Sequence, residues 1–240
     1  SLTKLNQPSM FEVANIEGAI QKNIFGDIRD FKLLEMALKS SEAEIVIHLA
    51  AQSLVRESYK DPINTYDTNI MGTVNLLEAA RKVKSVKAIL NVTSDKCYEN
   101  REQLWGYHEN DAMGGYDPYS SSKGCSELIS SAYRNSFLQE AGIALATARS
   151  GNVIGGGDWA KDRIVPDSIN SFISNKVLII RNPAATRPWQ HVLEPLSGYL
   201  ILCQQLILHP NRYTEAWNFG PNDQDVKSVS TLADIMVENW

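Results

Sequence analysis

Tyr119 and Lys123 are four residues apart in the segment YSSSK, and together they could transfer a proton at an alcohol. On a helix, residues at this spacing lie one turn apart on the same face, so both side chains can contact one ligand. A tyrosine with an ordinary pKa of about 10 is a weak base near neutrality, but a neighbouring ammonium favours the phenolate and lowers that pKa. The pair therefore makes Tyr119 a plausible general base, although a solvated helix-surface pair is the more common explanation of this spacing taken alone, and the motif needs its context.

A second group of reactive side chains, Ser94, Asp95 and Lys96, directly follows the apolar run at residues 88–92. The C-terminal ends of strands are where open α/β sheets place their sites. Asp95 and Lys96 could act as acid and base beside the alcohol, which is more proton-transfer machinery than a simple hydride transfer requires. The alternative for the same residues is a turn with a helix cap.

A parallel sheet is needed to position these side chains. Short apolar runs at residues 45–49, 88–92 and 144–148 predict strands, and the first two are each followed by polar residues and a long helical pattern. This alternation is typical of parallel strands joined by crossover helices. The expected helices cover residues 62–83 and 118–140, and the second begins with Asp117 as its cap and a proline at its first position.

The predicted fold class is α/β, a doubly wound parallel sheet with a smaller α/β lobe that is interleaved with it. Residues 1–150 would form a dinucleotide-binding domain, and residues 151–240 a substrate-binding lobe. The sequence has no Gly-rich turn of the kind that holds a pyrophosphate after the first strand, because Gly155, Gly156 and Gly157 lie far downstream and precede no amphipathic helix. We therefore expect the N-terminal strands of the sheet, and the C-terminal end of the lobe, to be missing from this chain.

Composition excludes several classes of function. The net charge is −5 and basic residues are scattered among acidic ones, so a nucleic-acid or membrane surface is not expected. Three cysteines without a CxxC pair or a suitably spaced histidine argue against a disulfide framework and a metal site, and they favour a reducing, cytoplasmic location. No apolar run approaches the ~20 residues that span a bilayer.

Six segments resemble the extended short-chain dehydrogenase/reductases, which have a Rossmann-type sheet. They are GDIRD at 26–30, HLAAQ at 48–52, NIMGT at 69–73, TSDK at 93–96, YSSSK at 119–123 and RSGNVIG at 149–155. Longer strings resemble the branch of this family that dehydrates CDP-glucose, namely TSDKCY at 93–98, GGYDPY at 114–119 and RPWQHV at 187–192. The resemblance implies an NAD-dependent lyase that converts CDP-glucose to CDP-4-keto-6-deoxyglucose in deoxysugar biosynthesis.

The resemblance also implies a role for each reactive side chain. Tyr119 would take the proton of the sugar 4-hydroxyl as hydride passes from C4 to NAD, while Lys123 binds the nicotinamide ribose and Ser94 hydrogen-bonds the same hydroxyl. The resulting ketone acidifies the C5 proton. Asp95 would protonate the departing C6 hydroxyl and Lys96 would move the C5 proton, or the two could exchange or share these roles. Hydride then returns to C6, so NAD is regenerated in each turnover.

Further positions match cofactor-binding and substrate-binding residues of the same family. Asp27 and the backbone at Ile28 would bind the adenine edge of NAD, and Asn69 would connect the strand end to the active-site loop. The ribose and phosphate side of NAD would be lined by Leu49, Ala50, Ala51 and Gln52. In the lobe, Arg187 would clamp the substrate diphosphate in bidentate fashion. The nucleotide-sugar groove would be lined by Asn152, Arg163, Val165 and Arg181, although surface ion pairs explain Arg163 and Arg181 nearly as well.

Family resemblance implies a homodimer in which the helices over residues 62–83 and 118–140 pack with their copies into a four-helix bundle.

Alternatives remain for the activity. Dehydratases acting on dTDP-glucose carry Asp-Glu where this chain has Asp95-Lys96, and UDP-hexose 4-epimerases need no elimination pair, whereas UDP-N-acetylhexosamine 4,6-dehydratases share an Asp-Lys pattern. A further alternative is an inactive relative that only binds nucleotide sugars. His48 and His191 are expected to be structural.

Overall fold

The computed structural model describes residues 9–240, which form two units that are described separately. The first unit contains residues 24–150 and 196–219, and the second contains residues 9–23, 151–195 and 220–240. Residues 1–8, which the sequence assigns to the dinucleotide-binding domain, lie outside the described residues. Residues 196–219 fall within the predicted lobe but contribute most of one helix and one strand to the first unit.

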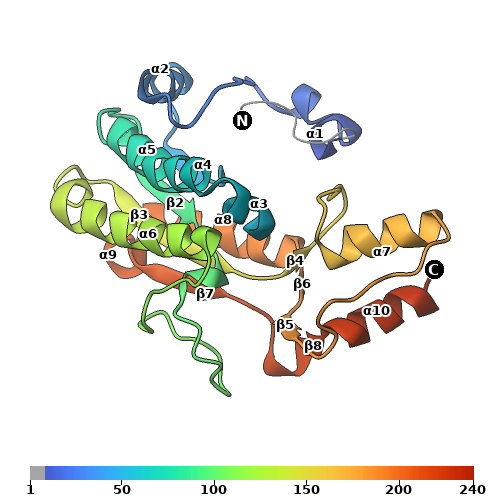
Figure 1. The fold of residues 1–240 in the computed structure, drawn as a ribbon. Coiled ribbons are helices and arrows are strands. Elements are labelled where there is room, and N and C mark those ends of the chain that lie inside the picture. The colour runs from blue at the N-terminus through green and yellow to red at the C-terminus, as the bar shows by residue number, and fades with distance from the viewer. Residues whose placement is uncertain (1–8) are drawn as a thin grey trace. The chain divides into compact units, whose positions relative to one another are not determined.

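A sheet of four parallel strands forms the centre of the first unit, in the order β1-β2-β3-β7 (Figure 1). Its strands are β1 (Ile45–His48), β2 (Ala88–Val92), β3 (Ala144–Ser150) and β7 (Ala216–Phe219). The first three strands coincide with the apolar runs of the sequence, so the predicted parallel α/β fold is confirmed. β7 was not predicted, because the four residues AWNF are too short a run to show a periodicity.

Helices connect these strands, since parallel neighbours require crossover connections. The helix predicted over residues 62–83 is observed as α4 (Pro62–Tyr66), a π-helical turn (Asp67–Met71) and α5 (Gly72–Ala80). The helix predicted over residues 118–140 is observed as α6 (Pro118–Tyr133) followed by a π-helical turn (Arg134–Leu138). The unit also contains α2 (Phe31–Ser41), α3 (Val55–Lys60), most of α8 (Leu193–Leu208) and α9 (Pro210–Tyr213).

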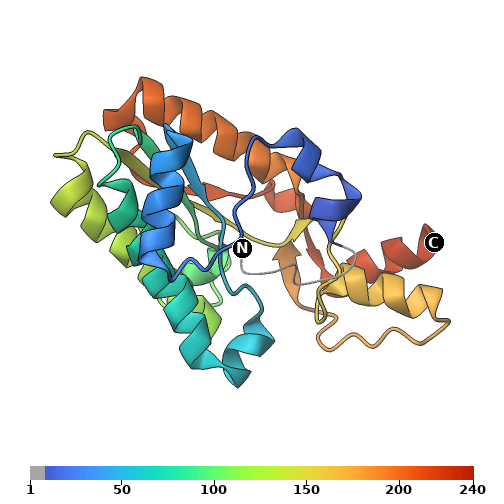
Figure 2. The same cartoon turned by 90° about the horizontal axis from the view of Figure 1, so that it is seen from above.

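Each face of the sheet packs against its own helices. On one face, Ile89 and Leu145 join a buried apolar cluster with Leu76 and Leu77 of α5. On the other face, Leu90 and the alanines of β3 pack against residues of α8, namely Tyr199, Leu202, Cys203 and Leu206. Figure 2 shows α8 along one face of the sheet, with α5 and α6 on the opposite side. The central strands are therefore buried on both faces, as the continuous apolar runs predict.

Helices α4 and α6 begin with the same local arrangement. The side chain of Asp117 accepts a hydrogen bond from the backbone N–H of Ser120 at 2.9 Å, and Pro118 occupies the first helical position. Asp61 caps α4 in the same way, with Pro62 at the first position. An acidic cap satisfies a helix-terminal N–H, and proline needs no acceptor there, so both starts are determined locally.

The second unit contains short strands in two pairs, one short helix and two longer helices. The strands are β4 (Val153–Ile154) parallel to β6 (Gln190–His191), and β5 (Thr186–Pro188) antiparallel to β8 (Val226–Ser228). The helices are α1 (Met10–Val13), α7 (Ile164–Ile173) and α10 (Val229–Glu238), with 3₁₀ turns at Ile16–Ala19 and Asp223–Asp225. The rings of Phe172 and Trp240 lie 5.3 Å apart, so they bring α7 and the chain after α10 together.

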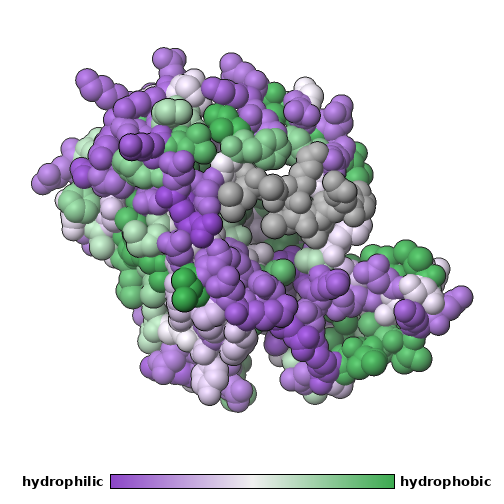
Figure 3. Space-filling model, turned by 45° about the horizontal axis from the view of Figure 1, so that its top comes forward, coloured by the Kyte–Doolittle hydropathy of each residue, from purple (hydrophilic) through white to green (hydrophobic). Residues whose placement is uncertain are grey.

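Apolar side chains are exposed on the second unit, where Figure 3 shows them gathered at the end formed by α7 and α10. They include Ile173, Val177, Ile179 and Val237. None of the helices in residues 9–240 combines the length and the apolar character that crossing a membrane requires. The same residues contain no group of three or more side chains that could hold a metal ion.

Candidate active site

The tyrosine and lysine of the YSSSK segment lie in the first two turns of α6, and both are buried. The ammonium of Lys123 donates a hydrogen bond to the carbonyl of Val92, the last residue of β2, at 3.3 Å. This contact places the helix start against the C-terminal end of β2. The solvated-pair explanation is therefore wrong for this segment, because neither Tyr119 nor Lys123 is more than 8% exposed.

Burial lowers the pKa of Lys123. Desolvation lowers its pKa from 10.5 to about 8, and the carboxylate of Glu127, one turn further along α6, opposes that change. Among the described residues the structure gives this ammonium one acceptor, the carbonyl of Val92. Because an ammonium has three donors, hydrogens remain for the hydroxyls of a ligand.

Ser94, Asp95 and Lys96 form the turn that follows β2. Ser94 is the N-cap of the 3₁₀ turn Asp95–Cys97, and its hydroxyl accepts from the backbone N–H of Lys96 at 3.2 Å and donates to the carboxylate of Asp95 at 3.0 Å. The turn with a helix cap, which was the alternative for these residues, is therefore present. A capping role does not prevent the same groups from acting in a site. Asp95 is half-buried and Lys96 is exposed.

Gly124 allows this turn to lie close to α6. A Cβ at Gly124 would lie 3.3 Å from the carbonyl oxygen of Cys97 and 3.1 Å from that of Gly114. The N–H of Gly114 in turn donates to the carbonyl of Cys97 at 2.9 Å. A larger residue at this position would push the turn away from the face of α6 that carries Tyr119 and Lys123.

Asp27 is held by an ion pair beside the start of the first unit. The guanidinium of Arg29 binds both oxygens of Asp27, with the shortest distance 2.6 Å, and hydrogen bonding to Arg29 lowers the pKa of Asp27. The next residue, Ile28, packs directly on α5, where a Cβ at Gly72 would lie 2.7 Å from its Cγ2 atom. The predicted adenine-binding segment is therefore fixed from both sides by the protein itself.

Asn69 connects the segment after β1 to α6. Its Oδ1 accepts from the backbone N–H of Gln52 at 2.8 Å, and its Nδ2 donates to the carbonyl of Gln52 at 3.0 Å and to the hydroxyl of Ser122 at 2.8 Å. Both amide hydrogens are used within the protein, so the geometry gives Asn69 a positioning role. Leu49 and Ala50, which complete the predicted cofactor wall with Ala51, are exposed.

His48, at the end of β1, is buried, and its Nε2 lies 3.4 Å from the hydroxyl of Thr73. Desolvation lowers its pKa from 6.5 to about 3, with a smaller contribution from the charge of Lys123. This histidine is therefore neutral throughout the physiological range. That state agrees with the structural role expected from the sequence.

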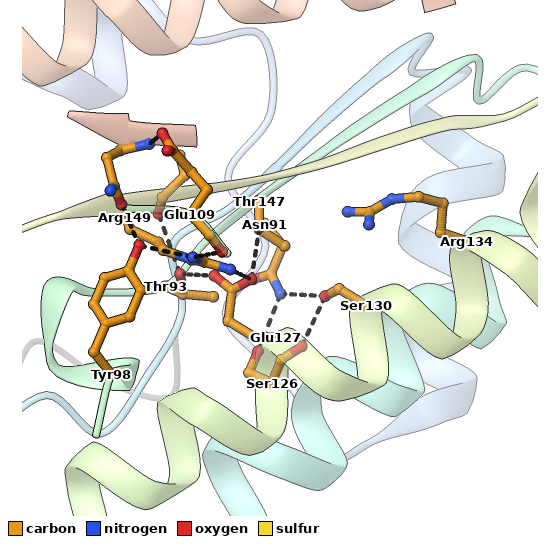
Figure 4. A network of polar contacts seen from close by, with 12 residues as sticks. Asn91, Thr93, Tyr98, Glu109, Ser126, Glu127, Ser130, Arg134, Thr147 and Arg149 are labelled. Atoms are coloured by element: carbon orange, nitrogen blue, oxygen red, sulfur yellow. Dashed lines mark hydrogen bonds and ion pairs between the residues drawn. The ribbon is translucent and has the colours of Figure 1, made fainter. Parts of the chain in front are cut away.

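The structure also reveals an ion pair that the sequence reasoning missed, between Glu127 of α6 and Arg149 of β3 (Figure 4). The distance from Arg149 Nη2 to Glu127 Oε2 is 2.8 Å, and the side chains are only 4% and 5% exposed. One signal was available, because Tyr119, Lys123 and Glu127 recur at intervals of four on one helix face. The partner Arg149 could not be predicted, because it comes from another strand.

The predicted substrate-binding residues belong to the second unit, and their surroundings differ. Arg163 pairs with Asp158 at 2.9 Å and Arg181 pairs with Asp162 at 3.2 Å, and both arginines are exposed. The surface ion pairs considered for these arginines are thus present in the structure. Val165 is a half-buried residue of α7.

Arg187 and Asn152 have features that fit a ligand site within the second unit. Arg187 on β5 is the register partner of Lys227 on β8, and like charges at paired positions repel unless an anion lies between them. Asn152 has a left-handed backbone with φ of 47°, and its buried Oδ1 has no hydrogen-bond partner in the part of the chain that the structure describes. A buried amide oxygen without a partner is costly, so a donor from a ligand would stabilise it.

Comparisons with known proteins place the chain in a family of sugar-nucleotide dehydratases. The family model described as GDP-mannose 4,6 dehydratase matches residues 5–218. The chain is 56% identical over 238 residues to a CDP-glucose 4,6-dehydratase of Salmonella typhimurium, covering 97% of this chain and 66% of that relative. It is 28% identical over 222 residues to a dTDP-D-glucose 4,6-dehydratase of Dictyostelium discoideum, covering 88% of this chain and 48% of that relative.

Solved structures show the same fold. A double mutant of a dTDP-glucose 4,6-dehydratase from Streptomyces venezuelae, with NAD bound, superposes with a TM-score of 0.80 at 23% identity over 94% of this chain and 66% of that one. The enzyme of the same name from Bacillus anthracis, in complex with NAD, gives 0.77 at 23% identity over 98% of this chain and 70% of that one. The chain therefore spans about two thirds of the length of these proteins.

Proposed function

Because the chain belongs to the GDP-mannose 4,6-dehydratase family, we propose that the protein is an NAD-dependent 4,6-dehydratase that converts CDP-glucose to CDP-4-keto-6-deoxyglucose. The observation that carries the proposal is the buried Tyr119 and Lys123 pair, which lies at the same strand end as Ser94 and Asp95. The relative that is 56% identical supports CDP-glucose as the substrate. Dehydration of this sugar is a hydro-lyase reaction.

NAD, when bound, would supply the acceptor of the C4 hydride and later the donor of hydride to C6. The first unit has suitable groups to hold it. Asp27, already ionised by its contact with Arg29, would accept from the adenine amine, and the segment 49–52 would line the ribose and phosphates. The spare donors of the buried Lys123 ammonium fit the two hydroxyls of a ribose.

The first proton transfer would use Tyr119 as base and Lys123 as its electrostatic partner. The phenolate of Tyr119 would take the proton of the 4-hydroxyl, and the ammonium one turn away favours this phenolate. Ser94 would orient the same hydroxyl from the other side. Because all three groups are buried at one strand end, little water is present to compete for the hydroxyl.

The elimination would use the turn after β2. A base removes the C5 proton, the C6–O bond breaks, and an acid protonates the departing hydroxyl so that it leaves as water. Asp95, in its protonated form, is the proposed acid, and the Ser94 hydroxyl at 3.0 Å positions its carboxyl group. Lys96 is the proposed base, and the two roles could be exchanged, because both side chains belong to the same short turn.

The diphosphate of the substrate would bind to the second unit through Arg187. Its register partner Lys227 places a second cation beside it, and a diphosphate would neutralise both charges. The unpaired Oδ1 of Asn152 would accept from a hydroxyl of the nucleotide sugar. Val165, Arg163 and Arg181 would complete the groove, and the last two would exchange their surface partners for the ligand.

A homodimer is the proposed assembly. Exposed apolar side chains lie on the helices that the sequence assigns to a four-helix bundle, among them Ile63 of α4 and Leu128 of α6, which are 81% and 61% exposed. Burying such a surface against its own copy would form an isologous interface. Sedimentation of the purified protein at several concentrations tests this assembly directly.

The activity is tested by incubating the protein, expressed from its complete natural gene, with NAD and separately with CDP-glucose, dTDP-glucose, UDP-N-acetylglucosamine and UDP-glucose. The proposal predicts the mass loss of one water from CDP-glucose, abolished in Tyr119→Phe. Water loss from another nucleotide sugar alone would change the substrate, and inversion at C4 without water loss would indicate an epimerase. Binding of CDP-glucose and NAD without any turnover would indicate a non-catalytic relative.

A further inference from the structure

We propose that Glu127 is a positioning residue for the proton-transfer chemistry, and that it acts through Thr93 to hold the Ser94–Asp95 turn in register with Tyr119 and Lys123. This inference rests on the proposed function and deepens it, because it assigns to the reaction a residue that contacts neither substrate nor NAD. The partner that fixes Glu127 is the buried guanidinium of Arg149.

The carboxylate of Glu127 is bound by three side chains from the sheet. Its Oε1 accepts a short hydrogen bond from the hydroxyl of Thr93, which is the residue immediately before Ser94. Its Oε2 accepts from the hydroxyl of Thr147 at 2.7 Å and from Arg149 at 2.8 Å. All of these side chains are buried, as Figure 4 shows for their arrangement between α6 and the strands.

Two successive turns of α6 therefore hold two successive residues at the end of β2. Lys123 binds the carbonyl of Val92, and Glu127 binds the hydroxyl of Thr93. The backbone N–H of Thr93 also donates to the carbonyl of Ala148 on β3 at 2.8 Å. The chain leaves this anchored point directly into Ser94 and Asp95, so the position of these two side chains depends on the anchor.

Arg149 extends the network to the loop after the turn. Its Nη1 donates to the hydroxyl of Tyr98 at 2.8 Å and to the carbonyl of Glu109 at 2.9 Å. Tyr98 in turn donates to Asn218 Oδ1 at 2.6 Å. The reactive turn at 94–97 is thus fixed at both of its ends, by Thr93 on one side and by Tyr98 on the other.

Stability alone does not explain so deep an ion pair. Replacing a buried pair by apolar residues of similar volume is often neutral or stabilising, because the desolvation of both charges offsets their attraction. Here the Nε of Arg149 is also buried without a hydrogen-bond partner within residues 9–240. A polar arrangement that adds little stability, located next to reactive groups, is better explained by the geometry and charge that it provides.

Glu127 also acts on the charge of Lys123. Besides the proposed base Tyr119, three titratable groups act on this ammonium: Glu127 on α6, Cys97 on the turn after β2 and His48 on β1. Burial raises the pKa of Cys97 to about 12 and lowers that of His48 to about 3, so both are neutral near pH 7. The carboxylate of Glu127 is then the charge among them that favours the ammonium over the neutral amine.

A matched pair of substitutions separates positioning from simple stability. Thr93→Val and Thr147→Val each remove one hydroxyl donor from the carboxylate of Glu127 at a buried threonine, but only the first releases the turn. We expect Thr93→Val to lower kcat by roughly 10-fold or more, because displaced catalytic groups slow a reaction by such factors. Thr147→Val should lower kcat by less than about 3-fold, at a similar loss in Tm. Equal losses of kcat in both variants would overturn the proposal.

Glu127→Gln tests the charge, and it is read by NMR of the lysine side chains so that turnover is not needed. Removing the carboxylate should shift the titration midpoint of Lys123 to lower pH by about 1 unit or more, since an opposite charge nearby favours the charged form. An unchanged or higher midpoint would contradict the proposal.

If the wild type turns over no nucleotide sugar, the proposed function fails, whereas this titration still decides the role of Glu127. If Glu127→Gln does not fold, the kcat comparison of the two threonine variants decides it.

Discussion

The two units of the protein hold their candidate residues in different ways. In the first unit, Tyr119, Lys123 and Glu127 are buried, and hydrogen bonds from α6 anchor the end of β2. In the second unit, Arg163 and Arg181 are exposed and each has an ion-pair contact with one aspartate. The difference indicates that the protein itself organises Tyr119 and Lys123, whereas a ligand would organise Arg163 and Arg181.

This contrast agrees with what each task requires. Proton transfer depends on geometry within a few tenths of an ångström, and surrounding hydrogen bonds supply that precision before substrate arrives. Binding of a diphosphate requires cations that can give up weak surface partners, and an exposed ion pair is worth only about 0–1 kcal/mol. Substitutions in each unit test this difference between the two units.

The largest effect is expected for the proposed base. Tyr119→Phe removes the hydroxyl while it keeps the buried ring, so kcat should fall by roughly 10²–10⁴-fold, the usual contribution of a general base. Binding of NAD, followed by calorimetry, should change little. Retention of more than a tenth of the activity would remove Tyr119 from the mechanism and with it the central role of the first unit.

The next effect concerns stability and compares two ion pairs. Arg149→Met leaves the buried carboxylate of Glu127 without its cation, so the free energy of unfolding should fall by about 3–5 kcal/mol. The matched variant Arg163→Met breaks an exposed pair and should cost at most about 1 kcal/mol. Urea denaturation of both variants measures the difference, and similar losses would mean that the two units are not organised differently.

Arg187 should affect binding more than turnover. Charge-assisted hydrogen bonds contribute about 1.5–3 kcal/mol, so Arg187→Ala should raise the KM for the nucleotide sugar by roughly 10- to 100-fold. Its kcat should stay within a few-fold of the wild type, unlike that of Tyr119→Phe. Lys227→Ala should shift KM in the same direction, because the two residues are register partners. A loss in kcat with KM unchanged would assign Arg187 to the chemistry instead.

The smallest expected effect is the pH dependence of stability at His48. Its pKa in the folded protein, about 3, is below the ordinary 6.5, so the unfolded chain binds a proton that the folded protein does not. This contribution to stability is therefore fully present well above pH 6.5 and is lost as pH falls toward 3, by about 1.4 kcal/mol at pH 5.5.

His48→Gln should reduce the difference in unfolding free energy between pH 8 and pH 5.5 by that amount, as measured by urea denaturation. A wild-type difference retained in His48→Gln would show that other groups cause the acid sensitivity.

Local signals predicted the first unit well. Asp117 and Pro118 located the start of α6, and the apolar runs located β1, β2 and β3, because caps and burial on both faces leave clear patterns in the sequence. The short strand β7 and the ion pair of Glu127 with Arg149 were missed. Both depend on contacts between segments far apart in the chain, which no local pattern records.

The candidate site shows the same division. The spacing of Tyr119 and Lys123 predicted that the two residues share a helix face, and the turn after β2 was placed correctly at a strand end. The positioning role of Asn69 could not be derived from spacing, since it arises from contacts with Gln52 and Ser122. The same limit applies to Asp27, whose carboxylate is held by Arg29.

In the proposed reaction, hydride leaves C4 of CDP-glucose and returns to C6 within one turnover. The most direct measurement uses CDP-glucose with deuterium at C4, incubated with NAD and the protein expressed from its complete natural gene, with the product analysed by NMR. We expect a 4-keto-6-deoxy product that carries the deuterium on C6. Deuterium found again at C4 of an unchanged or inverted sugar, with no loss of water, would contradict it.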